Sequence, residues 1–405
     1  MGPLRTVVFV AAAVSAAGAT LASLDISHCK LPAVSGRDDV ALGFPRIANR
    51  MRSTGAVNFS ILFVDFSDAP ATKTPAAFMD LLDPATAYYA EMSYGAMAPA
   101  FLPLLRTLRM SQPSTAYSFA TFDTQKHYLV EASALGAAAG WDFSTSDSIV
   151  VIATPPAFKS GPAFCAEPGT GFVASGRTFE NGATSGSDLL VWGSRWANHE
   201  LGHTMGLVDL YAFNTSGDAL LFRFTGGWSL MGNIQATGNE YFGWERWLLG
   251  WVADAEVMCA GAGETSVTLV PIETPAAVLR SSGSSMRLVV APIGPTTAVV
   301  VEARAAVGAD VGIPAPGLLV YILDSSIPTG YGPLRVLPLN LTDGGQKLFY
   351  TLLPGSTLQY GSVTVQYARS SAPGTVVVEL SSACSTANCF PPAYCNASGA
   401  CVEGA

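Results

Sequence analysis

The sequence predicts an α+β protein made of two unequal parts and a short tail. In residues 46–255, patterns typical of strands and of helices alternate, whereas from about residue 264 the chain consists of short β-rich runs separated by Gly, Pro and Ser. Four of the seven cysteines lie in the last 22 residues. A chain of 405 residues is too long for one ordinary hydrophobic core. We therefore expect a mixed domain at 46–255, an all-β domain at 256–380 and a cysteine-rich tail at 381–405.

Two segments of the first part have the composition of buried strands. Residues 57–66 are rich in β-branched and aromatic side chains and end in a turn-forming cluster, and residues 147–153 form a second short apolar run. Residues 75–94 lie between them and have the apolar spacing of a helix. Residues 159–187 are rich in Gly, Ser, Thr and Asn without an apolar period, which predicts a long surface loop.

The second part is expected to be all β. Its predicted strands are residues 266–272, 286–293, 297–303, 318–323, 348–353 and 375–380. Short strands of this kind, separated by turn residues, are typical of two packed antiparallel sheets. We expect a sandwich-like domain at 256–380.

The amino terminus has the layout of a secretory signal. A short basic start precedes an apolar run at residues 6–17 and small residues suited to cleavage, so residues 1–22 form the predicted signal peptide and 23–45 an N-terminal extension. The alternative is a membrane anchor, but this apolar run is shorter than the roughly 20 residues that span a bilayer. We expect a secreted, extracellular protein without a membrane span after cleavage.

Export agrees with the cysteines and with four possible glycosylation sites. The tail cysteines Cys384, Cys389, Cys395 and Cys401 are expected to form disulfides, whose connectivity the sequence leaves open. Cys29, Cys165 and Cys259 are an odd set in which one thiol is left over. The N-x-S/T sequons are at Asn58, Asn214, Asn340 and Asn396.

Composition and charge exclude some classes of partner. With 49% hydrophobic and 13% charged residues, the chain has the composition of a packed globular protein. The formal net charge is −9, and Lys and Arg form no cluster. No basic surface for nucleic acid or anionic lipid is therefore expected.

The most specific motif is the run HELGHTMGLVD from His199 to Asp209. On a helix, His199 and His203 lie one turn apart on the same face, so both imidazoles can bind one Zn²⁺. Glu200 lies between them and is the expected general base toward a metal-activated water. This spacing predicts a hydrolytic zinc centre.

The residues around the motif fit a helix with one buried face. Ala197, Leu201 and Val208 are expected to face the core. Ser194 or Asp188 is expected to cap the helix start, because a side-chain oxygen at that position accepts a backbone N–H.

A catalytic zinc needs a third protein ligand and one open position. Gly206 permits a sharp bend after the helix, since glycine adopts positive φ readily, and the bend would return Asp209 to the metal. Glu240 and Glu245 are the alternatives, as carboxylates from a second helix. A purely structural zinc site is the other interpretation, but such sites have four protein ligands, often cysteines, and no cysteine lies near this helix.

Several stretches in the same order resemble one family. They are residues 62–68 (LFVDFSD), 89–95 (YAEMSYG), 199–211, 227–232 (GWSLMG) and 243–251 (GWERWLLGW), with weaker similarity at 300–304 and 317–324. With these stretches, the chain resembles the immune inhibitor A family of secreted metalloproteases, which are similar to metzincins in placing a methionine turn beneath the zinc.

The resemblance implies a metzincin-like catalytic domain with a twisted sheet and an active-site helix. It implies His199, His203 and Asp209 as zinc ligands, Glu200 as the catalytic residue and Met231 as the methionine of the turn. The implied function is a secreted zinc endopeptidase, which we expect to act as a monomer on protein or peptide substrates. The chain departs from the family in lacking a long pro-region.

Two other functions stay open. The chain could be a catalytically inert secreted glycoprotein that keeps the protease fold, although the intact Glu200 argues against this. Alternatively, the β domain and the cysteine tail could bind matrix or glycan, with proteolysis incidental.

Two further site assignments are weighed against simpler interpretations. Asp65, Asp68 and Glu180 are candidate ligands of Ca²⁺, with solvated loop carboxylates as the alternative. Cys29 could bind the zinc in a latent form, and an ordinary disulfide is the alternative.

Overall fold

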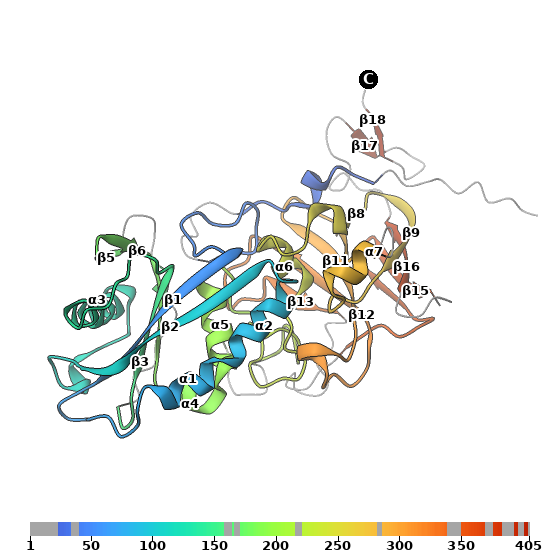
Figure 1. The fold of residues 1–405 in the computed structure, drawn as a ribbon. Helices are drawn as coiled ribbons and strands as arrows, with labels where there is room; N and C mark the ends of the chain where they lie inside the picture. The colour runs from blue at the N-terminus through green and yellow to red at the C-terminus, as the bar shows by residue number, and fades with distance from the viewer. Residues whose placement is uncertain are drawn as a thin grey trace, which may run out of the picture.

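The computed structural model describes residues 23–33, 40–157, 164–165, 171–214, 221–281, 286–337, 350–368, 376–382, 393–395 and 401–403. The predicted signal peptide, Cys384, Cys389, Asn340 and Asn396 lie outside the described residues. Helices and sheets are mixed, with an N-terminal part built on one large sheet and a C-terminal part built on two (Figure 1). Among the described residues, no helix combines the length and the apolar character that a membrane crossing requires.

The N-terminal sheet has five strands in the order β2-β1-β3-β7-β4. They are β1 (Gly55–Asp65), β2 (Met97–Arg109), β3 (Ser148–Ala153), β4 (Phe164–Cys165) and β7 (Asn181–Ser185). The pairs β1/β2, β1/β3 and β3/β7 are parallel, and β4 runs antiparallel to β7. The two predicted strands, β1 and β3, are therefore neighbours in the interior of the sheet.

Side chains of β1 point alternately into two cores. Ile61 and Phe63 pack in the core that contains α1 (Ala76–Leu82), α2 (Pro84–Met92) and α5 (Ser194–Thr204). Leu62 and Val64 pack in a second core with α3 (Phe122–Ala138), which Figure 1 shows on the other side of the sheet. Because both faces of β1 are covered, its sequence is a nearly continuous apolar run.

The single helix predicted at 75–94 is two helices, α1 and α2. Pro84 is the first residue of α2. Proline has no N–H and its ring clashes with the preceding turn, so α1 ends before it, whereas the first turn of a helix accepts proline.

The prediction of a surface loop at 159–187 was wrong. The described part of this segment contains β4, the hairpin β5 (Phe172–Ala174) and β6 (Arg177–Phe179), and the interior strand β7, all five residues of which are buried. Small residues let β7 lie close to its neighbours: a Cβ on Gly182 would come 3.0 Å from the carbonyl oxygen of Ile149 and 3.3 Å from Leu129. The sequence of β7 therefore shows small residues that permit close packing, and it lacks the apolar alternation by which a strand is usually predicted.

The C-terminal part contains two larger sheets. One has the order β13-β12-β11-β10-β8 and the other β14-β15-β16-β9. The strands are β8 (Val257–Cys259), β9 (Gly263–Leu269), β10 (Leu288–Pro292), β11 (Thr297–Arg304), β12 (Gly317–Asp324), β13 (Leu334–Val336), β14 (Thr357–Tyr360), β15 (Val363–Ala368) and β16 (Val376–Ser382). The described end of the predicted strand 348–353 forms only an isolated bridge between Leu352 and Leu318.

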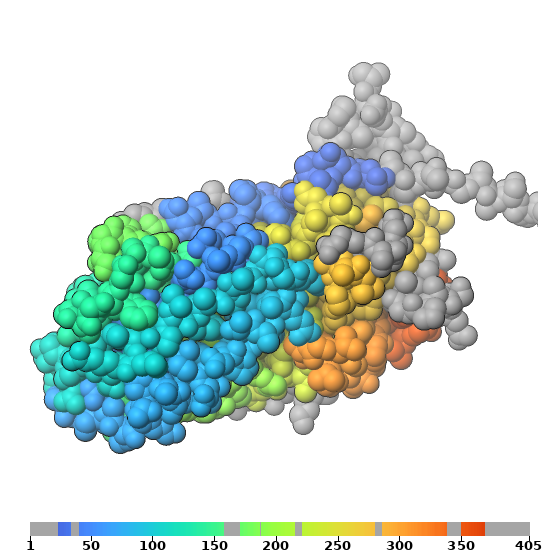
Figure 2. Space-filling view, in the orientation of Figure 1, coloured from blue at the N-terminus to red at the C-terminus, as the bar shows by residue number. Residues whose placement is uncertain are grey.

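The first of these sheets is covered on both faces. Val299 and Val301 of β11 pack with Val363 and Val365 of the opposing sheet. Val300, from the same strand, belongs to the large core that also holds α5. The N-terminal and C-terminal parts therefore share one hydrophobic core, and Figure 2 shows them as a single elongated body.

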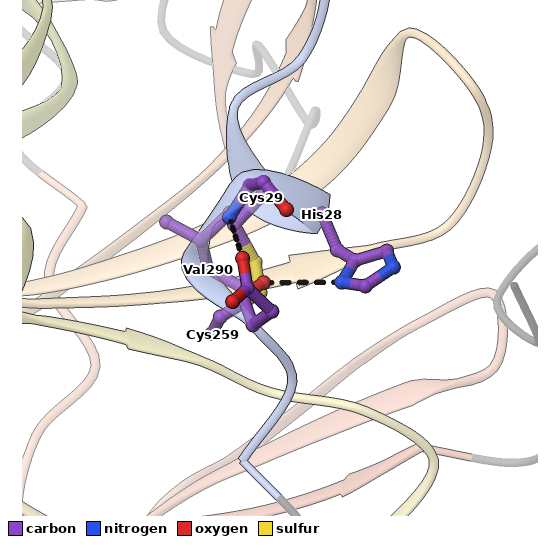
Figure 3. The surroundings of a disulfide bond; sticks show 6 residues. His28, Cys29, Cys259 and Val290 are labelled. Atoms are coloured by element: carbon purple, nitrogen blue, oxygen red, sulfur yellow. Dashed lines mark hydrogen bonds between the residues drawn. A yellow bond between two sulfur atoms is a disulfide. The ribbon is translucent and has the colours of Figure 1, made fainter.

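A disulfide joins the N-terminal extension to the C-terminal part. Cys29, at the end of the 3₁₀ helix η1 (Ile26–Cys29), is bonded to Cys259 of β8 with 5.7 Å between their Cα atoms (Figure 3). The Leu24 N–H also donates to the Cys259 carbonyl, at 3.1 Å. Cys29 is thus engaged away from the histidine helix, so the structure gives no support to Cys29 as a zinc ligand.

The tail contains a small hairpin. Strands β17 (Ala393–Cys395) and β18 (Cys401–Glu403) are antiparallel, and Cys395 lies opposite Cys401 in their register.

Candidate metal centre

The predicted histidine helix is α5, which follows the short helix α4 (Ser187–Trp192). Trp196, Ala197 and Leu201 are buried, which leaves His199 and His203 on the partly exposed side. The capping prediction was wrong, because α5 begins after Gly193 with no side-chain cap. Asp188 instead accepts the Gly186 and Leu189 N–H groups, at 2.8 and 2.9 Å, at the start of α4.

The helix ends in the glycine bend that the sequence predicted. Gly206 has φ of +103°, a conformation that other residues rarely adopt. The Gly206 N–H donates to the His203 carbonyl at 2.8 Å, and the Leu207 N–H to the Gly202 carbonyl at 3.0 Å. This is the hydrogen-bond pair of a Schellman motif. The chain therefore reverses within two residues and brings Asp209 back beside the histidines.

Three ligand atoms meet at this point. His199 Nε2 and His203 Nε2 lie 3.2 Å apart, and Asp209 Oδ1 is 3.2 Å from the first and 3.1 Å from the second. Each of the three side chains is 12–14% exposed, so the triangle lies close to the surface. These residues are the group that the described part of the chain offers to a metal ion.

The triangle fits a zinc ion. Nitrogen and oxygen ligands about 2.0–2.1 Å from a tetrahedral zinc are about 3.3 Å from one another. Asp209 Oδ1 is buried and receives no hydrogen bond, although two ring nitrogens lie within 3.2 Å of it. A cation between the three atoms would satisfy this oxygen, and two imidazoles with one carboxylate are a donor set typical of catalytic zinc.

Backbone carbonyls orient both imidazoles. His199 Nδ1 lies 2.9 Å from the Leu230 carbonyl oxygen, and His203 Nδ1 lies 2.8 Å from that of Leu207. Since a carbonyl only accepts, each Nδ1 must carry the proton, which leaves the Nε2 lone pair of a neutral ring directed at the centre of the triangle.

The three side chains of the triangle shift one another's pKa values. Burial by itself raises the pKa of Asp209, but the adjacent His203 and His199 outweigh it and hold that pKa well below its usual range. Burial lowers the pKa of His203, and the Asp209 carboxylate more than reverses this and raises it to about 9. The Asp209 carboxylate therefore favours positive charge close beside it, which a bound cation would supply.

Glu200 follows His199 on α5 and is partly exposed. Burial raises the pKa of its carboxyl group, while the two histidines oppose the shift. A carboxylate with a raised pKa is a stronger base than an ordinary glutamate.

Met231 lies beneath the histidine helix. It is fully buried, and a Cβ on Gly202 of α5 would come 2.7 Å from its sulfur. A tight turn holds it, with the Gly232 N–H donating to the Ser229 carbonyl at 2.9 Å and Ser229 at φ of +61°. The same turn supplies the Leu230 carbonyl that orients His199.

The alternative ligand Glu245 lies outside the triangle and supports this turn. It lies in α6 (Gly243–Leu248) and is fully buried. Its Oε2 accepts the Phe242 N–H at 2.7 Å and the Ser229 hydroxyl at 3.0 Å. Burial raises its pKa to about 7, although both hydrogen bonds oppose the shift.

The other rival ligand, Glu240, belongs to a buried ion network. Its Oε2 accepts a hydrogen bond from Arg246, and both side chains are fully buried. Its backbone N–H donates to Asp310 at 2.9 Å. Neither glutamate is in the triangle, and Asp209 is the carboxylate that the structure brings to the histidines.

The candidate calcium ligands have other partners or lie apart. Asp65 accepts two hydrogen bonds from Arg109, at 2.6 and 2.9 Å. Asp68 accepts the Ser114 N–H at 2.7 Å and the Ser114 hydroxyl at 2.9 Å. Glu180 lines a separate pocket with Arg50 and Asp147. In the described part of the chain the three do not form a cation site.

Residues 41–51 close the carboxyl end of α5. Arg46 Nη1 donates to the Met205 carbonyl at 2.9 Å, and the N–H groups of Ala41 and Met51 donate to the carbonyls of Gly206 and Thr204. Helix ends need such partners for their last carbonyl groups. The position of the bend thus depends on residues about 160 positions earlier in the chain.

Sequence reasoning missed several groups around the triangle. The Asp209 N–H donates to Thr329 Oγ1 at 2.9 Å, and Thr329 comes from the turn between β12 and β13. The Tyr211 ring stacks on that of His199, with 6.2 Å between centroids, and burial followed by the Asp209 charge raises the pKa of its phenol. Tyr211 lies two residues past the motif and could have been identified as a site residue from the sequence. Thr329 could not, because no motif surrounds it.

Comparisons with known proteins add little. No family model and no curated protein sequence matches the chain. Among solved structures, metalloproteinase-II from Bacteroides fragilis is similar with a TM-score of 0.26 and 13% sequence identity, over 56% of this chain and 61% of that one. At this level of likeness, neither the fold nor the activity of that enzyme transfers to the chain.

Proposed function

We propose that the chain is a secreted zinc endopeptidase of the metzincin type, similar to the immune inhibitor A family. The observation that carries the proposal is the triangle of His199 Nε2, His203 Nε2 and Asp209 Oδ1, whose atoms are 3.1–3.2 Å apart. Met231 beneath α5 supports the metzincin relation. The sequence at residues 1–22 supports secretion.

The chain's own residues supply positioning and proton transfer. Leu207 and Leu230 accept Nδ1–H of the two imidazoles and so direct both Nε2 atoms toward the position of the metal, and Thr329 holds the backbone of Asp209. A bound zinc would supply Lewis-acid chemistry, polarising a peptide carbonyl and acidifying water. Glu200 takes a proton from the attacking water and returns it to the amide nitrogen as the peptide bond breaks, so no acyl-enzyme forms.

The test is metal analysis combined with cleavage of peptides and casein by the purified mature chain. We expect about one zinc per molecule, and loss of cleavage with a chelator that zinc restores. An inert glycoprotein would bind zinc without cleaving in any condition. A protein whose β domain is the working part would bind matrix or glycan with the same affinity with and without the chelator.

Glu200→Gln separates catalysis from metal binding. The amide cannot take the proton, so cleavage should fall by about 10²–10⁴-fold, the usual contribution of a general base. Zinc content should remain that of the wild type, because Glu200 is outside the ligand triangle. Glu264→Gln, at an exposed position, is the matched control. Full cleavage by Glu200→Gln would contradict the assigned role.

A further inference from the structure

A continuous series of aromatic rings leads from the metal centre to the surface. The rings of His199 and Tyr211 are 6.2 Å apart, those of Tyr211 and Phe213 are 5.6 Å apart, and those of Phe213 and Tyr331 are 6.2 Å apart. The first member is a metal-ligating side chain. The last two are exposed by 46% and 45%.

The exposure of these rings is selective. Within the described residues, the large exposed aromatic side chains are Phe122, Phe213 and Tyr331, and two of these three contact each other beside the metal centre. A single exposed apolar side chain is ordinary in a soluble protein, whereas a contiguous group is typical of a binding surface.

The fold fixes this surface from both of its parts. The Phe213 N–H donates to the Gly330 carbonyl, and the Gly330 N–H donates to the Asp209 carbonyl, each at 3.0 Å. The Phe213 ring lies directly on Gly330, where a Cβ would come 2.2 Å from the ring. Gly330 also has φ of +72°, so both its conformation and the space above it require glycine. The turn between β12 and β13 therefore positions Phe213 and, through the same hydrogen bonds, the backbone of Asp209.

The geometry points to a subsite for an aromatic or large aliphatic side chain of the substrate, formed by Phe213 and Tyr331 with Tyr211 as its inner wall. We propose it as the specificity determinant of this enzyme, and it rests on the proposed peptidase function. Aromatic rings bind such side chains through apolar burial and edge-to-face contact.

The distance from the metal sets the position of that side chain. Two ring-to-ring steps of 6.2 and 5.6 Å separate His199 from Phe213. An extended peptide rises about 3.3 Å per residue, so it covers this span within about four residues. The preferred side chain therefore lies within four residues of the cleaved bond, on one side of it.

The test compares matched peptides on the zinc-loaded full chain. Each peptide contains one cleaved bond, with Phe, Leu, Ala or Asp placed in turn at the four positions on either side. We expect kcat/KM to rise at least about 10-fold for Phe over Ala at one position, mainly through KM, since this is the range that apolar pocket contacts supply. Phe213→Ala and Tyr331→Ala should each reduce that Phe-to-Ala ratio several-fold.

Phe122→Ala is the control, since it removes an exposed ring on α3 and should leave the ratio unchanged. A wild type without aromatic preference, or a ratio that Phe213→Ala leaves intact, would overturn the subsite while leaving the peptidase assignment in place. If the wild type cleaves nothing, the peptidase function fails. In that case the subsite is tested separately, by measuring the binding of fluorescent Phe and Ala peptides to the Glu200→Gln variant. Equal affinities for the two peptides would refute the subsite.

Discussion

Two groups of buried acidic side chains balance their charge in different ways. At the metal centre, Asp209 Oδ1 faces two imidazole nitrogens and receives no hydrogen bond. Between α6 and β11, Arg304 donates to Glu302 at 2.7 Å and to Asp310 at 2.7 Å, and all three side chains are fully buried. Acidic side chains therefore have two roles in this protein. Beside an arginine they form buried ion pairs, and beside two imidazoles they can bind a metal ion.

This difference explains why the sequence left the third ligand open. Glu240 and Glu245 are acidic and buried, as a metal ligand can be, but one pairs with Arg246 and the other accepts hydrogen bonds from Ser229 and Phe242. A buried carboxylate that already has a guanidinium or hydrogen-bond donors has little to gain from a metal ion. What sets Asp209 apart is that its Oδ1 lies 3.1–3.2 Å from two imidazole nitrogens, since Glu240 Oε1 and Glu245 Oε1 are also buried without a hydrogen bond.

The largest expected effect comes from breaking the ion network. Arg304→Met keeps the approximate volume but leaves Glu302 and Asp310 buried without their cation, which should lower the free energy of unfolding by about 3–5 kcal/mol. Urea denaturation would measure it. Arg109→Met is the matched control, because Arg109 is half exposed beside Asp65 and its loss should cost clearly less stability than that of Arg304. Similar losses of stability in the two variants would show that the burial of Arg304 does not make its ion pairs more important than that of Arg109 with Asp65.

The pH dependence of stability tests Glu245. Its pKa is about 7 in the folded protein against an ordinary value of 4.5, so the folded state favours the protonated carboxyl group. That stabilisation is complete below pH 4.5 and is lost as the pH rises through about 7, a change on the order of 3 kcal/mol. Glu245→Gln should reduce the loss between pH 4.5 and 8, measured by urea denaturation with metal removed. Glu264→Gln should not, and an unchanged slope for Glu245→Gln would refute the assignment.

Asp209→Asn tests the other side of the comparison. The substitution removes the charge while keeping the shape, and zinc affinity should fall by more than about 100-fold, because even residues that only support a ligand contribute 10–100-fold. Competition with a chelating dye would measure it. Asp254→Asn removes a carboxylate that pairs with Lys30 on the surface and should leave zinc affinity unchanged. Wild-type affinity in Asp209→Asn would return Glu240 or Glu245 to consideration.

The smallest effect is expected at the contact between α5 and the methionine turn. Gly202→Ala places a Cβ 2.7 Å from the Met231 sulfur, so the turn must shift, at about 1–3 kcal/mol of stability. Because Leu230 in that turn orients His199, zinc affinity should also decline. The double variant Gly202→Ala/Met231→Ala makes room for the new methyl group. Because Met231→Ala alone also leaves a cavity, the cost of Gly202→Ala is compared in the wild type and in the Met231→Ala background, and equal costs would show that the two residues do not press on each other.

Short-range patterns in the sequence were enough to predict the local parts of the site. An i, i+4 histidine pair on a helix and a glycine at its end are short-range features, and the structure contains both, with Gly206 at positive φ. Strands β1 and β3 were predictable for the same reason, since full burial leaves a continuous apolar run.

The features that depend on residues far apart in the chain could not be predicted from local patterns, because they arise only when the chain folds. Strand β7 is made of small polar residues and is a strand only because β3 and β4 pair with it. The choice of Asp209 over Glu240 required Arg246 to be in place, and the orientation of the imidazoles required the carbonyls of Leu207 and Leu230. Backbone carbonyls are present at every residue, so no sequence pattern marks the two that accept these hydrogen bonds. Packing alone selects them, because only the folded chain brings a methionine turn and a glycine bend to the same pair of rings.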